Sequence, residues 1–256
     1  MKLPLMRDAS ERPLDNIAED GGFCAIFRRI ACVGDSLSSG EFEQVDAEGK
    51  KSYHDMFEYS WGQFIARMTG ACVLNFSRGG MTAKEYIESF AEQNGYWDGE
   101  KRCQAYILAL GVNDLFGYRQ PLGSVDEIDL ENPANNPENF AGYYAALIAR
   151  LRKIAPNAFF FLMTMPRELD DEFHRKAKEG HRELLHAIAE RMPRTYVLDF
   201  YRYAPIYNEE FKRNYYLHGH LNPCGYLLTA KMVASYIDYI VRQDPNSFDT
   251  VGFIPH

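Results

Sequence analysis

The sequence predicts an α/β fold in which a five-stranded parallel sheet is covered by helices on both faces. Short apolar runs alternate with longer amphipathic stretches, and this alternation recurs along most of the 256 residues. Short, nearly continuous apolar runs are typical of parallel strands that are buried on both faces. Strands that alternate with helices form a parallel sheet, because each crossover helix returns the chain to the same end of the sheet.

Five apolar runs are the predicted strands. Each is short and is bounded by Gly, Asn, Asp, Pro or Thr, which favour turns and strand ends. The predicted strands cover residues 29–33, 71–74, 105–110, 158–163 and 196–198. Residues 23–27 are predicted to form one further short strand, within an N-terminal extension that precedes the sheet.

The stretches between these strands have helical patterns. Residues 60–69 end at Gly70, and residues 82–93 end at Asn94 and Gly95, which are favourable residues beyond a helix C-terminus. Residues 138–154 place apolar side chains three to four positions apart, as a half-buried helix does. Two more helices are predicted, at about residues 170–191 and 225–242.

Two longer stretches, residues 38–58 and 117–137, are predicted to be irregular. The second contains several prolines and acidic residues, so we expect it to lie at the surface. Both stretches follow predicted strands and should therefore lie over the carboxyl edge of the sheet, where ligands bind in such folds. Loops of this length in compact domains often carry function.

The charge balance excludes some classes of partner. The chain has 28 Lys and Arg against 36 Asp and Glu, a formal net charge of −8. Nucleic-acid binding depends on Lys and Arg meeting phosphates, so we expect no nucleic-acid partner and no binding to an anionic membrane surface. No run approaches the ~20 apolar residues of a membrane-spanning helix, and the N-terminus does not read as a secretory signal.

The cysteines indicate a reducing compartment. Their number is odd, and Cys24, Cys32, Cys72 and Cys103 lie in apolar runs. We therefore predict buried thiols that pack as small hydrophobic residues, not a disulfide framework. The expected location is the cytoplasm.

A serine follows the first predicted strand. Gly34, Asp35, Ser36 and Leu37 place a hydroxyl at the carboxyl edge of the sheet, next to a flexible glycine, as a nucleophile requires. The chain contains no G-x-S-x-G motif of the α/β-hydrolases. Taken alone, the four residues are also a common turn sequence.

Three further segments place candidate residues at the same edge. Gly79 and Gly80 follow the second strand, where backbone N–H groups can approach a ligand, although a tight turn capped by Thr82 is the favoured interpretation of this segment taken alone. Asn113 follows the third strand, either as a hydrogen-bond donor or in an Asx turn. His220 lies in a loop before the last predicted helix, where no core is available to satisfy it.

The other histidines are weaker candidates for a functional role. His218 and His220 are two residues apart, which allows a metal pair, but no H-E-x-x-H motif or cysteine cluster accompanies them. His174 and His181 are spaced seven apart on a charged helix and are predicted to face solvent. We predict no metal site.

The order of these motifs resembles the SGNH hydrolase superfamily, the GDSL-type esterases and lipases, over about residues 30–242. The resemblance implies a flavodoxin-like three-layer α/β/α sandwich and hydrolysis of esters without a cofactor. It implies Ser36 as the nucleophile and His220 as the general base. The oxyanion hole would comprise the N–H groups of Ser36 and Gly80 and the amide of Asn113, with Gly79 as a less favoured register.

The chain departs from that family at one position. The family usually has Asp three residues before the histidine, and Leu217 stands there instead. A leucine cannot accept a hydrogen bond from the imidazole. We expect a backbone carbonyl to orient His220 in a Ser–His dyad, or else Asp199, Glu209 or Glu210 to reach it.

The proposed site spans residues 34–220, so one site draws on nearly the whole chain. We predict a single domain over residues 1–256, with an N-terminal extension at 1–28 and a C-terminal tail at 243–256. The tail is expected to dock on the body or on a neighbouring subunit. No pattern in the sequence defines the oligomeric state.

The substrate is predicted from the two edge loops. Tyr53 and Tyr118, with other aromatic and polar neighbours, favour a cleft for a sugar or other polar alcohol, although they could simply pack the loops. We therefore expect a small-molecule or carbohydrate ester carrying a small acyl group. Arg78 could bind a substrate anion but could equally be solvated.

Two other functions fit parts of the sequence. A non-catalytic binding module could keep the sandwich and lose activity together with the missing Asp. A nucleotide or phosphate binder could use residues 77–82 as an anion cradle, but the chain has neither G-x-G-x-x-G nor G-x-x-x-x-G-K-[ST].

Overall fold

A parallel sheet forms the centre of the computed structural model, which describes residues 9–249 and 251–252. Its strand order is β4-β1-β5-β6-β7, and every neighbouring pair is parallel. All five predicted strands are confirmed, with boundaries that differ by a few residues. The strands are β1 (Arg29–Gly34), β4 (Cys72–Ser77), β5 (Ala105–Ala109), β6 (Phe159–Met163) and β7 (Thr195–Leu198).

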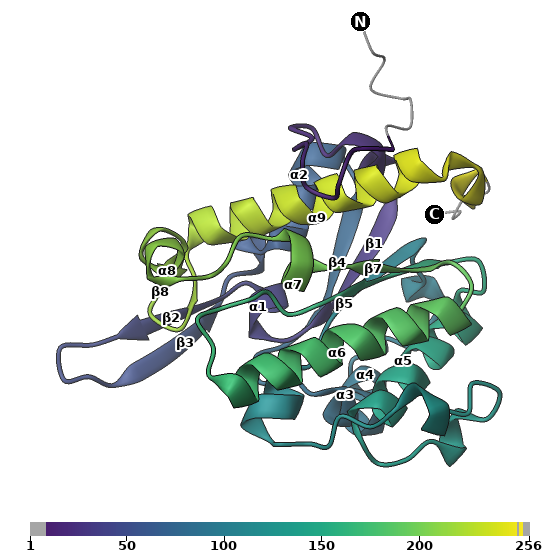
Figure 1. The fold of residues 1–256 in the computed structure, drawn as a ribbon, viewed down its shortest axis with the longest axis horizontal. Coiled ribbons are helices and arrows are strands. Elements are labelled where there is room, and N and C mark those ends of the chain that lie inside the picture. The colour runs from purple at the N-terminus through teal and green to yellow at the C-terminus, as the bar shows by residue number, and fades with distance from the viewer. Residues whose placement is uncertain (1–8, 250, 253–256) are drawn as a thin grey trace, which may run out of the picture.

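Helices cover both faces of this sheet, as Figure 1 shows. One face packs against α2 (Trp61–Thr69) and α9 (Pro223–Gln243), and the other against α5 (Phe140–Ile154) and α6 (Glu172–Arg191). Successive residues of a strand point to opposite faces, so Ile30 joins the core below α9 while Ala31 joins the core below α5. The three-layer α/β/α sandwich is therefore confirmed.

The helix ends follow the capping residues in the sequence. Ser60 accepts a hydrogen bond from the N–H of Gln63 at the start of α2, and Gly70 ends this helix with a φ of 70°. Asn139 caps α5 in the same way, and Asn222 caps α9. The predicted helices at these positions and at α6 are confirmed.

The predicted strand at residues 23–27 is wrong. Residues Gly22–Ile26 form a 3₁₀ helix instead. Gly21 and Gly22 have positive φ values, and the N–H of Phe23 donates to Asp238 of α9 at 2.8 Å. The extension therefore finds its hydrogen-bond partners on a helix and needs no neighbouring strand.

The predicted helix at residues 82–93 is interrupted. It consists of α3 (Ala83–Glu85), a π-helical turn at Tyr86–Phe90, and α4 (Ala91–Gln93). The rings of Tyr86 and Phe90 pack edge to face at 5.6 Å within the wider turn. A π turn inside a helix is a known local variation and is frequent near functional sites.

The stretch 38–58, predicted to be irregular, contains regular structure. A short helix α1 (Ser36–Ser39) leads into an antiparallel hairpin of β2 (Glu41–Val45) and β3 (Lys51–Asp55). The Asp46 carboxylate accepts the N–H groups of Glu48 and Lys50 and closes the hairpin turn, in which Gly49 has a φ of 82°. Figure 1 shows this hairpin projecting from the body of the molecule.

The last third of the chain supplies the remaining short elements. Helices α7 (Phe200–Tyr203) and α8 (Glu209–Tyr215) precede a small hairpin of β8 (Tyr216–Leu217) and β9 (His220–Leu221). Strands β8 and β9 lie against β2 of the projecting hairpin. Residues 117–137 contain only short 3₁₀ turns, at Val125–Glu127 and Pro133–Asn135.

Beyond α9 the chain returns to the body, where Phe248 stacks on Phe159 at 4.8 Å. Residues 253–256 of the predicted tail and residues 1–8 of the predicted extension lie outside the described residues. Among the helices of the described ranges, none is long and apolar enough to cross a membrane.

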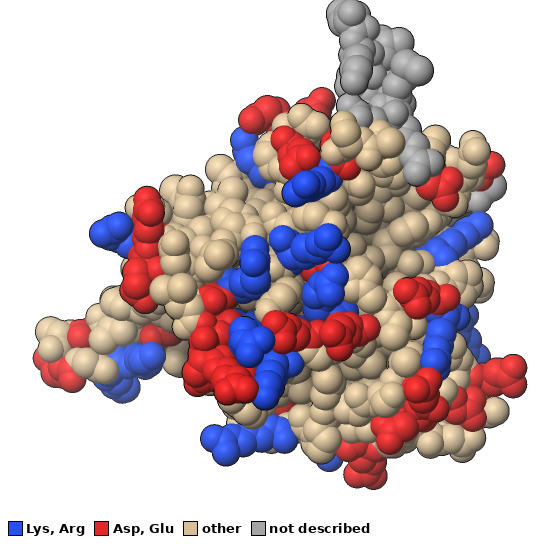
Figure 2. Space-filling view, viewed as in Figure 1, with Lys and Arg blue, Asp and Glu red and all other residues tan. Residues whose placement is uncertain are grey.

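All five cysteines are free thiols. Cys24, Cys32 and Cys103 are buried as predicted, whereas Cys72 is exposed because it begins β4, an edge strand of the sheet. On the face shown in Figure 2, Lys and Arg side chains lie interspersed with Asp and Glu side chains.

Candidate active site

Ser36 lies where the central strand β1 meets helix α1. The carboxylate of Asp35 caps this helix by accepting the N–H of Leu37 at 3.0 Å. A side chain at Gly34 would collide with Ser38, so the turn requires a glycine at this position. Ser36 is half-buried at the carboxyl edge of the sheet, as the sequence predicts.

Gly80 presents its backbone to open space. Its φ is 73°, and a Cβ added there would meet no atom within 4 Å. A side chain at Gly79 would instead collide with the carboxylate of Glu41. Thr82 caps α3 by accepting the N–H of Glu85 at 3.1 Å, so the capping interpretation of this segment is correct and is compatible with an exposed Gly80.

Asn113 joins the segments that follow β1, β4 and β5. Its side-chain amide donates to the carbonyl of Met81 at 3.1 Å and lies 3.5 Å from the carboxylate of Asp35. The neighbouring Asp114 is fully buried and accepts the N–H of Ala83 at 2.8 Å. The segments that carry Ser36, Gly80 and Asn113 are therefore brought together by direct hydrogen bonds.

The two acidic side chains in this cluster are hard to ionise. Burial raises the pKa of Asp35 to about 7, against the opposing effect of the Leu37 N–H. Burial likewise raises the pKa of Asp114 to about 6, although the N–H of Ala83 favours the carboxylate. Both increases in pKa arise mainly because burial removes the charged carboxylate from water.

His181 supports the turn before Asn113 and corrects a prediction. It was expected to face solvent, but it is fully buried, and its Nε2 donates to the carbonyl of Leu110 at 3.2 Å. Burial lowers its pKa to about 4, so the ring is neutral. Its ring packs closely against Gly111, which has a φ of 131° and no room for a side chain. The exposed His174 instead pairs with Asp171 at 2.8 Å.

His220 begins β9 and lies between two glutamates of strand β2. Its Nδ1 is 3.2 Å from Glu43 Oε2, and its Nε2 is 3.2 Å from Glu41 Oε1. The ring of Tyr53 contacts the imidazole edge to face, with centroids 5.7 Å apart. Helix α1 and strand β9 are neighbours, but within the described residues there is no hydrogen bond between Ser36 and His220.

The predicted partners of His220 are wrong. Asp199 instead pairs with Arg182 at 2.7 Å and His186 at 3.0 Å, contacts that hold the pKa of its carboxyl below the usual range although the side chain is buried. Glu209 and Glu210 are exposed in the first turn of α8. The group at Nδ1 is a carboxylate and not a backbone carbonyl.

Sequence reasoning missed Glu43 because it lies 177 residues from His220 in a segment predicted to be irregular. The sequence nevertheless contains a pattern that predicts the hairpin carrying Glu43. Glu41 and Glu43 alternate around Phe42, which is the period-two pattern of a strand, and Asp46 and Gly49 provide a turn immediately afterwards. A hairpin at this place would put both carboxylates on one face.

A cavity of about 550 Å³ opens beside these residues. Its wall includes Leu37, Val112 and Gly219, each the sequence neighbour of a candidate residue. Buried apolar side chains, among them Trp61 and Phe200, form another part of the wall. The cavity is therefore continuous with the carboxyl edge of the sheet at the candidate site.

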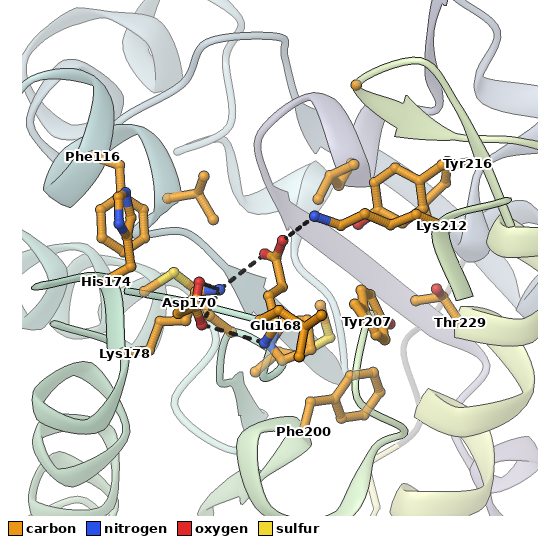
Figure 3. A pocket seen from close by; sticks show the side chains of 18 of the residues that line it. Phe116, Glu168, Asp170, His174, Lys178, Phe200, Tyr207, Lys212, Tyr216 and Thr229 are labelled. Carbon is orange, nitrogen blue, oxygen red and sulfur yellow. Dashed lines mark hydrogen bonds and ion pairs between the residues drawn. The ribbon is translucent and has the colours of Figure 1, made fainter. Parts of the chain in front are cut away.

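Side chains of opposite charge line part of the cavity, as Figure 3 shows. Lys178 is 5% exposed and lies 2.9 Å from Glu168 and 3.0 Å from Asp170. Lys212 lies 2.7 Å from the other oxygen of Glu168. Burial disfavours the Glu168 carboxylate, but hydrogen bonds from the two lysines hold its pKa below the usual value. The wall is polar, and its charges are largely paired.

The aromatic and basic residues of the edge loops, which were expected to line one substrate cleft, lie in different places. Trp61 is buried at the cavity, and Tyr53 lies on His220. Tyr118 is exposed beside a separate surface depression. Arg78 pairs with Glu85 at 2.6 Å, so this guanidinium already has an anionic partner.

Solved structures with the same fold include carbohydrate esterases. A family two carbohydrate esterase from Clostridium thermocellum, solved with cellohexaose, aligns with a TM-score of 0.59 and 16% identity, over 91% of this chain and 67% of that one. A carbohydrate esterase family 2 enzyme with a carbohydrate binding domain from Corynascus thermopiles aligns with a TM-score of 0.55 and 15% identity, over 83% and 66%. A protein from Lactobacillus plantarum aligns with a TM-score of 0.57 and 16% identity, over 83% and 97%.

At these identities the structural similarity establishes the fold alone. A comparison with curated proteins gave no match. The model of the GDSL-like Lipase/Acylhydrolase family matches residues 32–228, a range that contains every candidate residue described above. The chain belongs to the GDSL-like lipase/acylhydrolase family.

Proposed function

We propose that the protein is a serine esterase that removes small acyl groups from a sugar or another polar alcohol. The observation that carries this proposal is that hydrogen bonds join the Ser36, Gly80 and Asn113 segments at one edge of the sheet, with His220 on β9, which contacts helix α1. These four residues come from separate parts of the chain. Their convergence supports nucleophilic catalysis with an oxyanion hole.

In the proposed mechanism, Ser36 Oγ attacks the ester carbonyl while His220 Nε2 accepts the serine proton. The carbonyl oxygen becomes negatively charged and is stabilised by the N–H groups of Ser36 and Gly80 and by the amide of Asn113. One such donor contributes roughly 10²–10³ in rate. His220 then returns the proton to the leaving alcohol, and water hydrolyses the acyl-enzyme by the reverse sequence.

Nε2 of His220 has to change partner for this reaction. In the resting structure it faces Glu41 Oε1 at 3.2 Å. Burial raises the pKa of Glu41, with His220 acting in the opposite direction, so the Glu41 carboxyl is a comparatively readily protonated neighbour. Rotation of the Glu41 side chain, which is 14% exposed, away from the ring would free Nε2 for Ser36.

The cavity supports a polar alcohol as the leaving group. Its volume of about 550 Å³ is ample for a sugar unit, and Glu168 and Asp170 offer carboxylate oxygens to hydroxyl groups. Both carboxylates are already held by lysines, so a neutral substrate does not need to bring a counter-charge. Carbohydrate esterases occur among the proteins with this fold, so a sugar ester is compatible with it.

Hydrolysis of two substrate series tests the proposal. Acetate release from acetylated mono- and oligosaccharides should be faster than release of long acyl chains from the same alcohols. Ser36→Ala should abolish both activities, while a surface control such as Glu172→Gln should keep them. Activity confined to long-chain esters would reject the small-acyl assignment, and wild-type activity in Ser36→Ala would reject the serine mechanism.

A non-catalytic binding module is the second candidate. The contact of Glu41 with Nε2 favours it, because this glutamate occupies the ring nitrogen that a general base uses. A fluorophosphonate that labels activated serines distinguishes the two functions. Labelling of Ser36 supports the esterase, whereas binding of a sugar without labelling and without hydrolysis supports the binding module.

A further inference from the structure

The ring nitrogen of His220 that faces away from the reaction has a buried carboxylate beside it. We propose that Glu43, on the projecting hairpin, positions His220 in place of the acid that the chain lacks at Leu217. This inference rests on the proposed esterase function, in which Nε2 is the nitrogen that accepts the serine proton. Glu43 is then a positioning residue, because it acts on substrate only through His220.

Glu43 meets the requirements of such a group. Its side chain is 3% exposed, and Oε2 lies 3.2 Å from Nδ1 of His220. Its other oxygen is 2.7 Å from the ammonium of Lys51 on the partner strand. The hydrogen bond from Lys51 holds the pKa of Glu43 below its usual value. Glu43 is therefore ionised at neutral pH and can accept a hydrogen bond from Nδ1–H.

The packing of two hairpins makes this contact possible. Strand β2 lies against β9, which carries His220. A side chain at Gly219 would collide with the carboxylate of Glu43 and displace it from His220, so the glycine immediately before His220 leaves room for this contact. The residue opposite Glu43 on β3 is Tyr53, whose ring contacts the imidazole. Neighbouring strand positions therefore hold the ring by a hydrogen bond and an aromatic contact.

The two glutamates on this face have different roles. Glu41 lies at Nε2, where a permanent acceptor would compete with Ser36, whereas Glu43 lies at Nδ1, where an acceptor fixes the useful tautomer. With Nδ1 protonated and held by Glu43, the lone pair of Nε2 is directed away from Glu43 and can accept the serine proton once Glu41 has moved aside. An acid bonded to the opposite nitrogen has this effect in serine hydrolases generally.

Several charged and polar groups surround His220. Glu41 and Glu43 face it from β2, and Tyr53 faces it from β3. Asp55 lies across the hairpin from Glu41, and Lys51 neutralises part of the charge of Glu43. Removing the charge of Glu43 withdraws stabilisation from the imidazolium form, so the acidic limb of the kcat/KM profile should move to lower pH.

Three variants of the full-length protein test the proposal. Glu43→Ala removes the acceptor and should lower kcat about 10²–10⁴-fold on a small acetate ester, with a much smaller change in KM. Glu43→Gln keeps an acceptor oxygen but no charge, so it should lose less activity and should show the shifted acidic limb. Glu48→Gln is the matched control, because Glu48 is an exposed residue in the turn of the same hairpin.

Histidine ring nitrogen spectra give a readout that does not depend on turnover. Long-range ¹H–¹⁵N correlations, assigned with His220→Gln, report which nitrogen of the neutral ring carries the proton. We expect the Nδ1–H tautomer of His220 in the wild type and in Glu48→Gln. In Glu43→Ala we expect a shift toward Nε2–H, the form that an unrestrained imidazole prefers in water.

The outcomes separate this inference from the esterase proposal. Hydrolysis with unchanged kcat/KM and unchanged pH profile in both Glu43 variants would overturn the role of Glu43 and leave the esterase intact. A wild type that hydrolyses nothing would overturn the esterase. In that case a retained Nδ1–H tautomer that is lost in Glu43→Ala would still establish that Glu43 holds His220, and its absence would overturn both proposals.

Discussion

The carboxylate of Asp114 accepts a hydrogen bond from the backbone N–H of Ala83 at 2.8 Å. Asp114 follows the proposed oxyanion residue Asn113, and Ala83 begins the helix that follows Gly80. The bond therefore connects the two segments that would supply oxyanion donors. Because Asp114 is fully buried, loss of its side chain removes the acceptor that the structure provides for this N–H.

We expect Asp114→Ala to lower kcat more than it raises KM. The variant leaves the Ala83 N–H without its acceptor and allows the Gly80 segment to move, which weakens contacts made mainly in the transition state. The free energy of unfolding should fall by about 1–3 kcal/mol. Asp114→Asn keeps an acceptor oxygen and is the control. Steady-state kinetics and urea denaturation measure both effects, and equal activities of the two variants would contradict the linking role.

Asp35→Asn should stabilise the protein at alkaline pH. Burial raises the pKa of Asp35 to about 7 in the folded protein, well above the ordinary value of 3.8. Between these two pH values the folded state binds the proton more tightly than the unfolded state, so this group's contribution to stability is lost as the pH rises from about 4 to about 7. Asparagine still caps α1 and has no charge to bury.

Urea denaturation of wild type and Asp35→Asn at several pH values measures this effect. The difference in unfolding free energy should be small at pH 4 and should reach on the order of 4 kcal/mol in favour of the variant at pH 8. Titration of Asp114 largely cancels in this difference, because both proteins contain that residue. A difference that is independent of pH would show that Asp35 is not a buried acid with a raised pKa.

Glu41→Gln should increase esterase activity in mildly acidic solution. The substitution removes the carboxylate that faces Nε2 of His220 and so removes a competitor for the nitrogen that serves Ser36. We expect kcat/KM at pH 6 to rise several-fold, whereas Glu43→Gln should lower it. The full pH profile of kcat/KM is the measurement. A fall in activity similar to that of the Glu43 variants would indicate that both glutamates position the ring.

Glu168→Gln tests the assignment of the cavity to the alcohol portion of the substrate. We expect KM for an acetylated sugar to rise about tenfold, the loss of one charge-assisted hydrogen bond, while hydrolysis of p-nitrophenyl acetate stays close to wild type. Glu172→Gln, an exposed residue at the start of α6, is the control. Equal losses on both substrates would point to a structural role of the pairs that Glu168 forms with Lys178 and Lys212.

The sheet and the main helices were predictable because their signals are local. Continuous apolar runs identify the strands, and Ser60, Gly70 and Asn139 define helix ends by their own conformational preferences. Residues 23–27 were misassigned because their apolar character reflects packing against α9. The backbone N–H of Phe23 donates to the side chain of Asp238, which lies more than 200 positions away in the sequence. A local sequence pattern cannot reveal such a distant partner.

Only those residues of the candidate site that lie in a recognisable sequence motif could be predicted. Ser36, Gly80, Asn113 and His220 lie in short segments of recognisable composition. Glu43 and His181 lie in segments without such a motif, and their importance arises from tertiary contacts with His220 and with the Leu110 carbonyl. Asp199 was a reasonable candidate from its place after β7, but Arg182 and His186 on α6 bind its carboxylate.

Active-site labelling tests the central claim most directly. The wild type, Ser36→Ala and Glu43→Ala are treated with a fluorophosphonate, and the rate and site of modification are measured by peptide mass spectrometry. We predict one adduct per chain on Ser36 in the wild type, no adduct in Ser36→Ala, and much slower labelling of Ser36 in Glu43→Ala. Absence of any adduct on Ser36 in the folded wild type, or an adduct on another residue that persists in Ser36→Ala, would contradict the assignment of Ser36 as the activated nucleophile.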